Sequence, residues 1–351
     1  MTALLGGTLI SMIPYRRPGL VLVPGMSPGH LVLALQRDLR ALGYLRNGLD
    51  GHFGPATTAA VRALQHDLLF NGGRGRDGLA PVAMRELNGT RVTAIDGRVD
   101  DAVAACIEDA LDDPRVPKLP RADDPAAENR RALDVLQALA PGALRVPVPF
   151  LLAVLAQESG LRHFRVPRLG DPDDFIVIGL NRGDAVRPDH ITSRGYGIGQ
   201  YTLFHHPPRA DEVRTVMIDP LLNVRRAARE LREKFDRFLI GAGLAVRADD
   251  RVAEIGGGPL RACRYPVADP RFQRDCRRCA QEAPKVTLDT GTPCFAGSGE
   301  RFRATDDHPE TSYADVPDRA RLGCDWPYAI RRYNGSGVDS YHHQAQVLTR
   351  L

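Results

Sequence analysis

A proline-rich stretch between Asp112 and Pro125 separates two parts of the chain whose apolar residues recur at helical spacing. Its closely spaced prolines, which include Pro114, Pro117 and Pro120, are incompatible with a regular helix or a central strand. We therefore expect a connecting segment between two helical domains. The predicted organisation is an N-terminal extension (1–28), a small module (29–92), a connecting segment (93–126) and a larger domain (127–351).

The composition excludes several classes of protein. With 351 residues, of which 43% are hydrophobic, the chain can supply a core for each of two domains. The net charge of +4 is spread along the sequence, so no nucleic-acid surface is predicted. No apolar run reaches the roughly 20 residues that a membrane helix needs, so no membrane span is predicted. The apolar segment from Met1 to Ile13 lacks the basic start and the cleavage site of a secretory signal.

The cysteines favour disulfides or free thiols over a metal. Their positions are Cys106, Cys263, Cys276, Cys279, Cys294 and Cys324. An even number in a protein that works outside the cytoplasm favours disulfides, although the sequence does not select the pairing. Cys276 and Cys279 have the spacing of half a zinc site, but no second such pair follows. The pairs His205-His206 and His342-His343 also lack metal-binding spacing, so we predict surface or core histidines, no metal and no cofactor.

The small module is predicted to contain two helices around a turn. Its motif residues are Leu35-Gln36, Leu42-Gly43-Tyr44, Asp50-Gly51-x-Phe53-Gly54, Thr57, Ala60-Val61 and Leu64-Gln65. This string closely resembles the three-helix peptidoglycan-binding domain found beside many cell-wall hydrolases. The resemblance implies that peptidoglycan is the partner. The candidate binding residues that it implies are Tyr44, Asp50, Gly51, Phe53, Gly54 and Thr57.

The helical pattern from Phe150 to Leu161 carries a candidate acid. Phe150, Val154 and Glu158 lie at positions i, i+4 and i+8, so the glutamate shares the apolar face of the predicted helix. Burial of an ionised carboxylate is costly, and this environment favours the protonated form that a general acid needs. The structural alternative is a helix-terminal carboxylate paired with an arginine. Gly160 is expected to end the helix just after Glu158.

Further motifs follow in a fixed order. They are Glu158-Ser159, Gly195-Tyr196-Gly197-Ile198-Gly199-Gln200, Asp219-Pro220 with Asn223, and Tyr333-Asn334-Gly335. Together they resemble the signature of soluble lytic transglycosylases and goose-type lysozymes. The resemblance implies a mainly α fold with a lysozyme-like catalytic domain, in which Glu158 acts first as acid and then as base on the MurNAc–GlcNAc bond of peptidoglycan. The implied sugar-binding residues are Ser159, Ser193, Tyr196, Gly197, Gln200, Tyr201, Tyr333 and Asn334.

Two departures from that signature leave the reaction open. The first is the length of the segment from Leu161 to Thr192, because family members usually place the glycine-rich motif soon after the Glu-Ser pair. A transglycosylase needs one carboxylate, because the C6 hydroxyl of the muramic acid attacks and leaves a 1,6-anhydro end. A hydrolase needs a second carboxylate to position water. The long segment between Leu161 and Thr192 offers Asp171, Asp173, Asp174, Asp184 and Asp189 as candidates, each of which is otherwise a solvated loop acid. The second departure is a cysteine-containing insertion at 251–322, which has no counterpart in the family.

The alternative from a different functional class is a structural protein that binds the cell wall without cleaving it. Its function would come from the N-terminal module alone, and it would need no acid on an apolar helix face. An enzyme of this kind is expected to act in the periplasm or outside the cell. Because no clear export signal is found, a phage endolysin and a delivered effector both fit the sequence.

Overall fold

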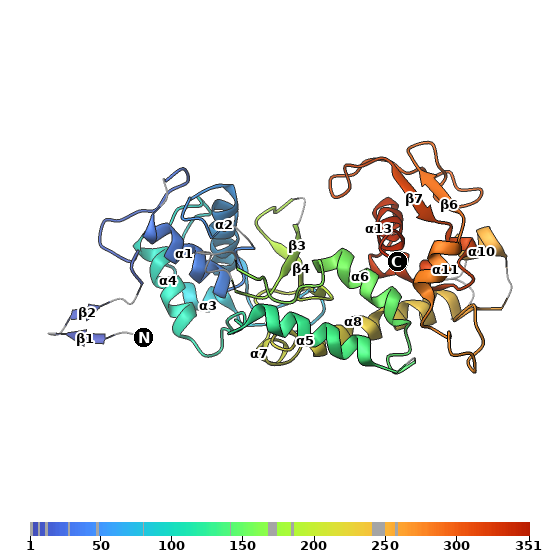
Figure 1. The fold of residues 1–351 in the computed structure, drawn as a ribbon. Coiled ribbons are helices and arrows are strands. Elements are labelled where there is room, and N and C mark those ends of the chain that lie inside the picture. Colours follow the sequence, from blue (N-terminus) through green and yellow to red (C-terminus); the bar gives the residue numbers. More distant parts are fainter. Residues whose placement is uncertain are drawn as a thin grey trace. The chain divides into compact units, whose positions relative to one another are not determined.

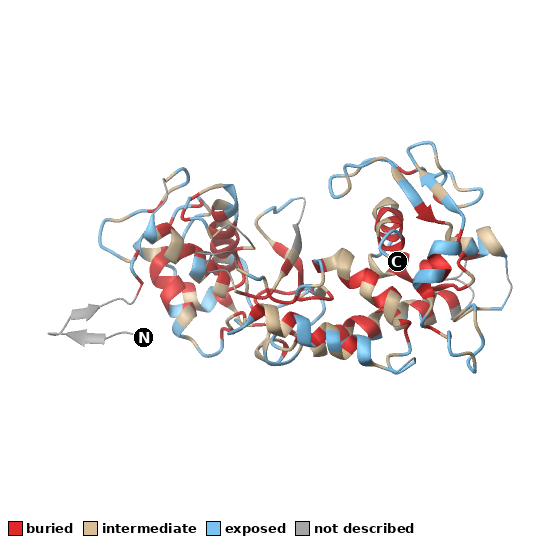
Figure 2. Cartoon of the chain, in the orientation of Figure 1, coloured by how far each residue is buried: buried red, intermediate tan, exposed pale blue. Residues whose placement is uncertain are grey.

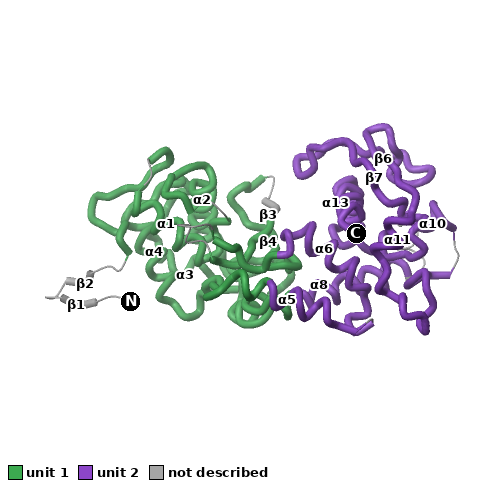
Figure 3. Tube along the Cα trace, in the orientation of Figure 1, with its two compact units in different colours: residues 1–129, 162–223 green, residues 130–161, 224–351 purple. Residues whose placement is uncertain are grey.

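The computed structural model describes all residues except 1–2, 6–7, 11–12, 27–28, 47–48, 80, 141, 168–173, 184–185, 241–249 and 257–258. The described chain is mainly helical, with short antiparallel strand pairs, as the sequence predicts (Figure 1). It forms two compact units that alternate along the sequence (Figure 3). Unit 1 comprises residues 1–129 and 162–223, and unit 2 comprises residues 130–161 and 224–351.

The first part of unit 1 is a helical cluster with one shared apolar core. Its helices are α1 (His30–Ala41), α2 (Pro55–Phe70), α3 (Met84–Asn88) and α4 (Asp101–Asp112). The strand pair β1 (Ala3–Leu5) and β2 (Thr8–Ile10) precedes them in the sequence. Leu35, Leu39, Val61 and Leu64 are fully buried where α1 and α2 contribute to this core. Helix α4 lies in the predicted connecting segment, and the Asp100 side chain caps it by accepting a hydrogen bond from the backbone of the third residue on.

The second part of unit 1 is a small antiparallel sheet with a helical turn beside it. It contains β3 (Ile178–Gly183), β4 (Ile191–Tyr196), β5 (Tyr201–Leu203), α7 (Ala210–Glu212) and the π-helical turn η1 (Val213–Met217). The strands are ordered β3-β4-β5, and Tyr196 pairs with Tyr201 across the connecting turn. Phe164, Ile176 and Tyr196 form the apolar core beneath the sheet. The glycine-rich motif therefore forms the end of β4 and the turn that follows it.

Unit 2 is built mainly from helices around a buried centre (Figure 2). Its elements are α6 (Val148–Ser159), η2 (Asp236–Ile240), α10 (Asp250–Ile255), α11 (Cys276–Glu282), β6 (Lys285–Leu288), β7 (Tyr313–Pro317), η3 (Arg319–Arg321), α12 (Trp326–Tyr333) and α13 (Val338–Leu348). The unit boundary falls within α5 (Pro125–Ala138) and α8 (Pro220–Phe235). Val154, Leu155, Trp326 and Ile330 are fully buried. Helix α6 packs against α13, which brings the two ends of unit 2 together.

The described part of the chain contains no helix that is long and apolar enough to cross a membrane. This finding agrees with the absence of a long apolar run in the sequence.

Candidate functional site

Glu158 lies in the last turn of α6, where the sequence pattern places it. Phe150 and Val154 on the same face are 1% and 0% exposed, whereas the Glu158 side chain keeps 18% exposure. Gly160 ends the helix in the left-handed conformation at φ 64°, which a glycine adopts without steric cost. The carboxyl group is thus largely removed from water but still accessible.

His343 on α13 is the hydrogen-bond partner of this carboxyl group. Its Nε2 lies 2.8 Å from Oε1 of Glu158, and the imidazole is 3% exposed. No other hydrogen bond to the Glu158 side chain occurs within the described residues of unit 2. The Nδ1 atom of His343 is buried and has no hydrogen-bond partner in the described structure. The sequence indicates only a surface or core histidine at His343, because no local pattern links residues on two distant helices.

Tyr333, at the end of α12, lies beside the pair. Its ring is nearly parallel to the imidazole of His343, with centroids 6.5 Å apart and an interplanar angle of 13°. Burial raises the pKa of the Tyr333 hydroxyl well above its usual value, and the charges of Glu230 and Glu158 raise it further. The phenol therefore stays protonated and can donate a hydrogen bond. Asn334 follows as the C-cap of α12.

A second carboxyl group, Glu230 on α8, lies in the same unit. Its side chain is 33% exposed and one oxygen is 3.8 Å from Nζ of Lys234. Burial raises the pKa of Glu230, the cations Lys234 and Arg226 lower it, and the charge of Glu158 raises it. The charge of Glu158 thus acts on the carboxyl group of Glu230. Nothing in the sequence marks Glu230, because on α8 it belongs to an alternating charged pattern that is typical of a solvated helix face.

The glycine-rich motif lies in unit 1 and is held by buried polar side chains. His163 is 0% exposed; its Nε2 is 2.7 Å from the Met217 carbonyl oxygen, and its Nδ1 is 3.3 Å from the backbone nitrogen of Ile198. Asn223 donates to the Tyr196 carbonyl and accepts from the Gly199 backbone. These contacts fix the turn from both sides.

The predicted sugar-binding residues are distributed over both units. Unit 2 contains Ser159, Tyr333 and Asn334, and unit 1 contains Ser193, Tyr196, Gly197, Gln200 and Tyr201. Several are used by the fold itself: the Ser159 hydroxyl donates to the Leu155 carbonyl at 3.1 Å, and the Gln200 amide donates to the Gly197 carbonyl at 2.7 Å. Tyr196 is fully buried, and Ser193 is 8% exposed. Their roles in sugar binding stay predictions.

Two of the candidate second aspartates form ion pairs within unit 1. Asp189 accepts two hydrogen bonds of 2.9 Å from the Arg62 guanidinium, and an Asp174 oxygen lies 2.7 Å from Nε of Arg121. The other three, Asp171, Asp173 and Asp184, lie outside the described residues.

The peptidoglycan-binding motif forms a turn that is fixed by Gln36. The Gln36 amide donates to Asp50, to the His52 carbonyl and to Thr57, and its oxygen accepts from the backbone of Gly51 at 2.8 Å. Of the candidate binding residues, Tyr44, Phe53 and Thr57 are at most 3% exposed, Gly51 adopts φ 74° and Gly54 is the N-cap of α2. Most of the motif thus shapes the turn.

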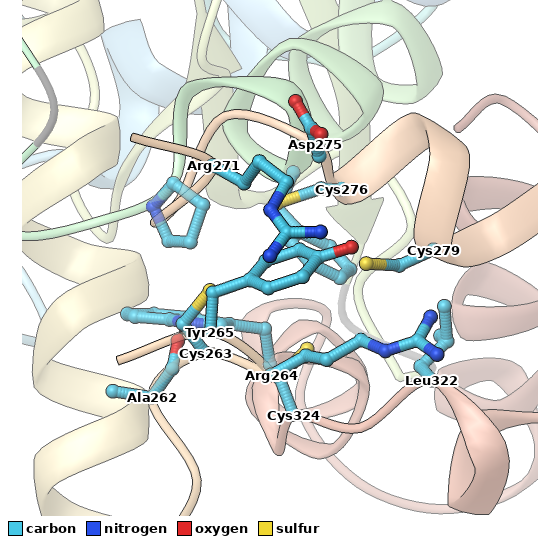
Figure 4. A pocket seen from close by; sticks show the side chains of 13 residues that line it. Ala262, Cys263, Arg264, Tyr265, Arg271, Asp275, Cys276, Cys279, Leu322 and Cys324 are labelled. Atoms are coloured by element: carbon cyan, nitrogen blue, oxygen red, sulfur yellow. Dashed lines mark hydrogen bonds between the residues drawn. The ribbon is translucent and has the colours of Figure 1, made fainter. Parts of the chain in front are cut away.

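Four of the six cysteines line one pocket of unit 2. Cys263, Cys276, Cys279 and Cys324 surround it, with Tyr265 and Arg264 beside them (Figure 4). Cys294 lines a different pocket, and Cys106 lies in α4. All six are free thiols. Among the described residues, no three His, Cys, Asp or Glu side chains are arranged to hold a metal ion.

Comparison with known proteins identifies the N-terminal module. Residues 28–68 match the family model described as a putative peptidoglycan binding domain. The chain therefore carries an N-terminal peptidoglycan-binding domain, as the motif resemblance predicts, and peptidoglycan is supported as its partner. No curated protein and no solved structure matches the chain. The lysozyme-like part of the resemblance stays a prediction.

Proposed function

We propose that the chain cleaves the glycan strand of peptidoglycan at the MurNAc–GlcNAc bond, with Glu158 as the acid and then the base. The observation that carries the proposal is the hydrogen bond between Glu158 and His343 inside unit 2. The peptidoglycan-binding domain supports the choice of polymer, since it would hold the enzyme at its substrate.

The geometry suits a proton donor. In cleavage, the acid protonates the leaving oxygen as the glycosidic bond breaks. When His343 donates its Nε2–H to Oε1, the other carboxyl oxygen is left to carry the proton that the leaving group receives. The same hydrogen bond stabilises the carboxylate that forms after the transfer. Glu158 can then take a proton back from the attacking hydroxyl group.

In the transglycosylase reaction, that hydroxyl is the C6 hydroxyl of the muramic acid, and the product has a 1,6-anhydro end. Hydrolysis is the second candidate reaction, and Glu230 is the observation that favours it. The carboxyl group of Glu230 is close enough for the charge of Glu158 to raise its pKa. Glycosidases that hydrolyse their substrate usually use a pair of carboxyl groups. In that reaction Glu230 would position the water molecule.

Glu158→Gln tests the proposal. Gln keeps the size of the side chain but cannot donate the proton, so we expect the release of soluble fragments from purified peptidoglycan to fall by about three orders of magnitude. Binding to peptidoglycan in a sedimentation assay should not change. Glu233→Gln, at an exposed position on α8, is the matched control and should keep full activity. Equal activity of the Glu158 variant and the native chain would rule out this residue as the acid.

Mass spectrometry of the released sugars separates the two reactions. Anhydro ends identify a transglycosylase, and reducing ends identify a hydrolase. If reducing ends are found, Glu230→Gln should abolish their release, because it removes the base that activates water. If only anhydro ends are found, the same variant should change the rate modestly.

A further inference from the structure

The pocket lined by four cysteines brings together thiols from three separate segments of unit 2. Cys263 precedes α11, Cys276 and Cys279 lie on α11, and Cys324 lies just before α12 (Figure 4). Cys276, Cys279 and Cys324 are 6–7% exposed, and Cys263 is half-buried. The same pocket is lined by Phe150 of α6 and Trp326 of α12, so the thiols face the apolar centre of the unit.

The thiols are close enough to influence one another. Burial raises the pKa of the Cys276 thiol, and the charges of Cys324, Cys263 and Cys279 raise it further. Burial likewise raises the pKa of Cys324 to about 12. Both thiols are therefore protonated and poorly nucleophilic at neutral pH.

The segment that contains these cysteines has little regular structure of its own. Between Gly256 and Asp325, the described residues form only α11, the hairpin of β6 and β7, and the short turn η3. Such a segment buries little apolar surface and usually needs a covalent or metal link to hold one conformation. The four cysteines gathered around α11 can supply such a covalent link.

We propose that these four cysteines form two disulfide bonds when the chain reaches an oxidising compartment. Each bond joins α11, through Cys276 or Cys279, to one of the flanking segments, through Cys263 or Cys324. The peptidoglycan-binding domain supports such a location, since peptidoglycan lies outside the cytoplasmic membrane, where disulfides form and persist. The inference goes beyond the proposed function and holds whether or not the chain cleaves glycan.

The oxidant is a disulfide, either of an oxidoreductase or of glutathione. The thiolate of Cys263, the most exposed of the four, attacks it and forms a mixed disulfide, and one thiol of the oxidant is released. A cysteine of α11 then attacks the Cys263 sulfur, which forms the protein disulfide and releases the second thiol. The second bond, between Cys324 and the remaining α11 cysteine, forms by the same two exchange steps with a second oxidant disulfide. Each bond thus removes two protons and two electrons from the chain and reduces one oxidant disulfide to two thiols.

Thiol counting on the full chain tests the proposal. The folded protein is incubated with glutathione disulfide, quenched in acid, denatured and alkylated. We expect two alkylated cysteines, Cys106 and Cys294, whereas a sample reduced before alkylation should show all six. The unalkylated oxidised chain should be lighter than the reduced chain by four hydrogens. Peptide mapping should find both bonds between α11 and a flanking cysteine.

Two variants make the count specific. Cys324→Ser should form one bond and leave three free thiols, because the α11 cysteine that pairs with Cys324 is left without a partner. Cys294→Ser, at a buried cysteine of another pocket, is the matched control; it should form both bonds and leave one free thiol.

Three results would overturn the proposal. The first is six alkylated cysteines after oxidation. The second is a bond between Cys276 and Cys279, which would tie α11 to itself. The third is a stoichiometric zinc ion in the purified protein that protects four thiols until a chelator removes it. Each readout is a thiol or metal count, so none depends on glycan cleavage.

Discussion

Two buried histidines, His163 in unit 1 and His343 in unit 2, use their ring nitrogens differently. His163 has a backbone partner at each nitrogen, the Met217 carbonyl and the Ile198 amide. His343 has one partner, the carboxyl group of Glu158, and its Nδ1 is buried with no partner in the described structure. Both rings are almost fully inaccessible, at 0% and 3% exposure, so burial alone does not distinguish them.

The hydrogen-bond partners of the two rings distinguish their roles. A ring whose two nitrogens both bind backbone holds a turn in place, and its hydrogen-bonding capacity is used by the fold. A ring that binds a partly exposed carboxyl group can instead orient an acid. We therefore assign a structural role to His163 and propose a positioning role for His343.

The largest effect expected from this comparison is the loss of stability of unit 1 in acid because of His163. Burial lowers the pKa of His163 to about 4, from about 6.5 in the unfolded chain. Below pH 6.5 the unfolded state therefore binds a proton that the folded state does not. The free energy of unfolding should fall by about 3 kcal/mol as the pH drops from 6.5 to 4, since each pKa unit corresponds to about 1.4 kcal/mol.

Denaturant unfolding at several pH values measures this effect. His163→Asn should be less stable at pH 7 but should lose less stability in acid, and the exposed His30→Asn should behave like the native chain. The buried His206, whose pKa burial also lowers, adds a loss of the same sign that both variants retain. An unchanged acid dependence in the His163 variant would contradict the structural assignment.

Gly197→Ala should destabilise unit 1 by about 2.5 kcal/mol. A β carbon at this position would lie 2.6 Å from Cε1 and Nδ1 of His163, and the backbone has φ +73°, which alanine adopts with strain. The imidazole cannot move away, because both of its nitrogens are bonded. Thermal or denaturant unfolding measures the change, and Gly299→Ala, where nothing lies within 4 Å, is the control. A stable Gly197 variant would show that the ring is free to shift.

The sequence places His343 among surface or core histidines without linking it to Glu158, and it assigns no role to His163. Periodicity places Glu158 at the end of a helix, and motif order marks the glycine-rich turn, because both signals are local. The contact between Glu158 and His343 depends on the packing of α6 against α13, which no local pattern encodes. The gathering of Cys263 and Cys324 around α11 is missed for the same reason. Residues that act within one segment are predictable from sequence, whereas partners from distant segments need the fold.

His343→Phe should lower glycan cleavage roughly 30-fold, which corresponds to about 2 kcal/mol in the activation free energy. The phenyl ring fills the site but cannot hydrogen-bond Oε1 of Glu158, so the carboxyl group loses its orientation. Because His343 is not proposed to touch substrate, kcat should fall while KM and peptidoglycan binding stay unchanged. His343→Gln, whose amide can donate to the same oxygen, should recover part of the loss. A variant that loses stability but retains kcat would give His343 the structural role of His163.

The smallest expected effect is that of Asp189→Asn. The ion pair of Asp189 with Arg62 is partly exposed, at 17% and 37%, and such pairs contribute about 0.5–1 kcal/mol to stability. Both Asp189 oxygens already accept hydrogen bonds from the guanidinium, so the carboxylate is engaged in much the same way as the ring of His163. We therefore expect glycan cleavage to stay within about twofold of the native rate, a change of under about 0.5 kcal/mol. A loss of cleavage of a hundredfold or more, with stability retained, would instead make Asp189 the second carboxylate. It would also show that bonding to the fold does not by itself exclude a residue from catalysis.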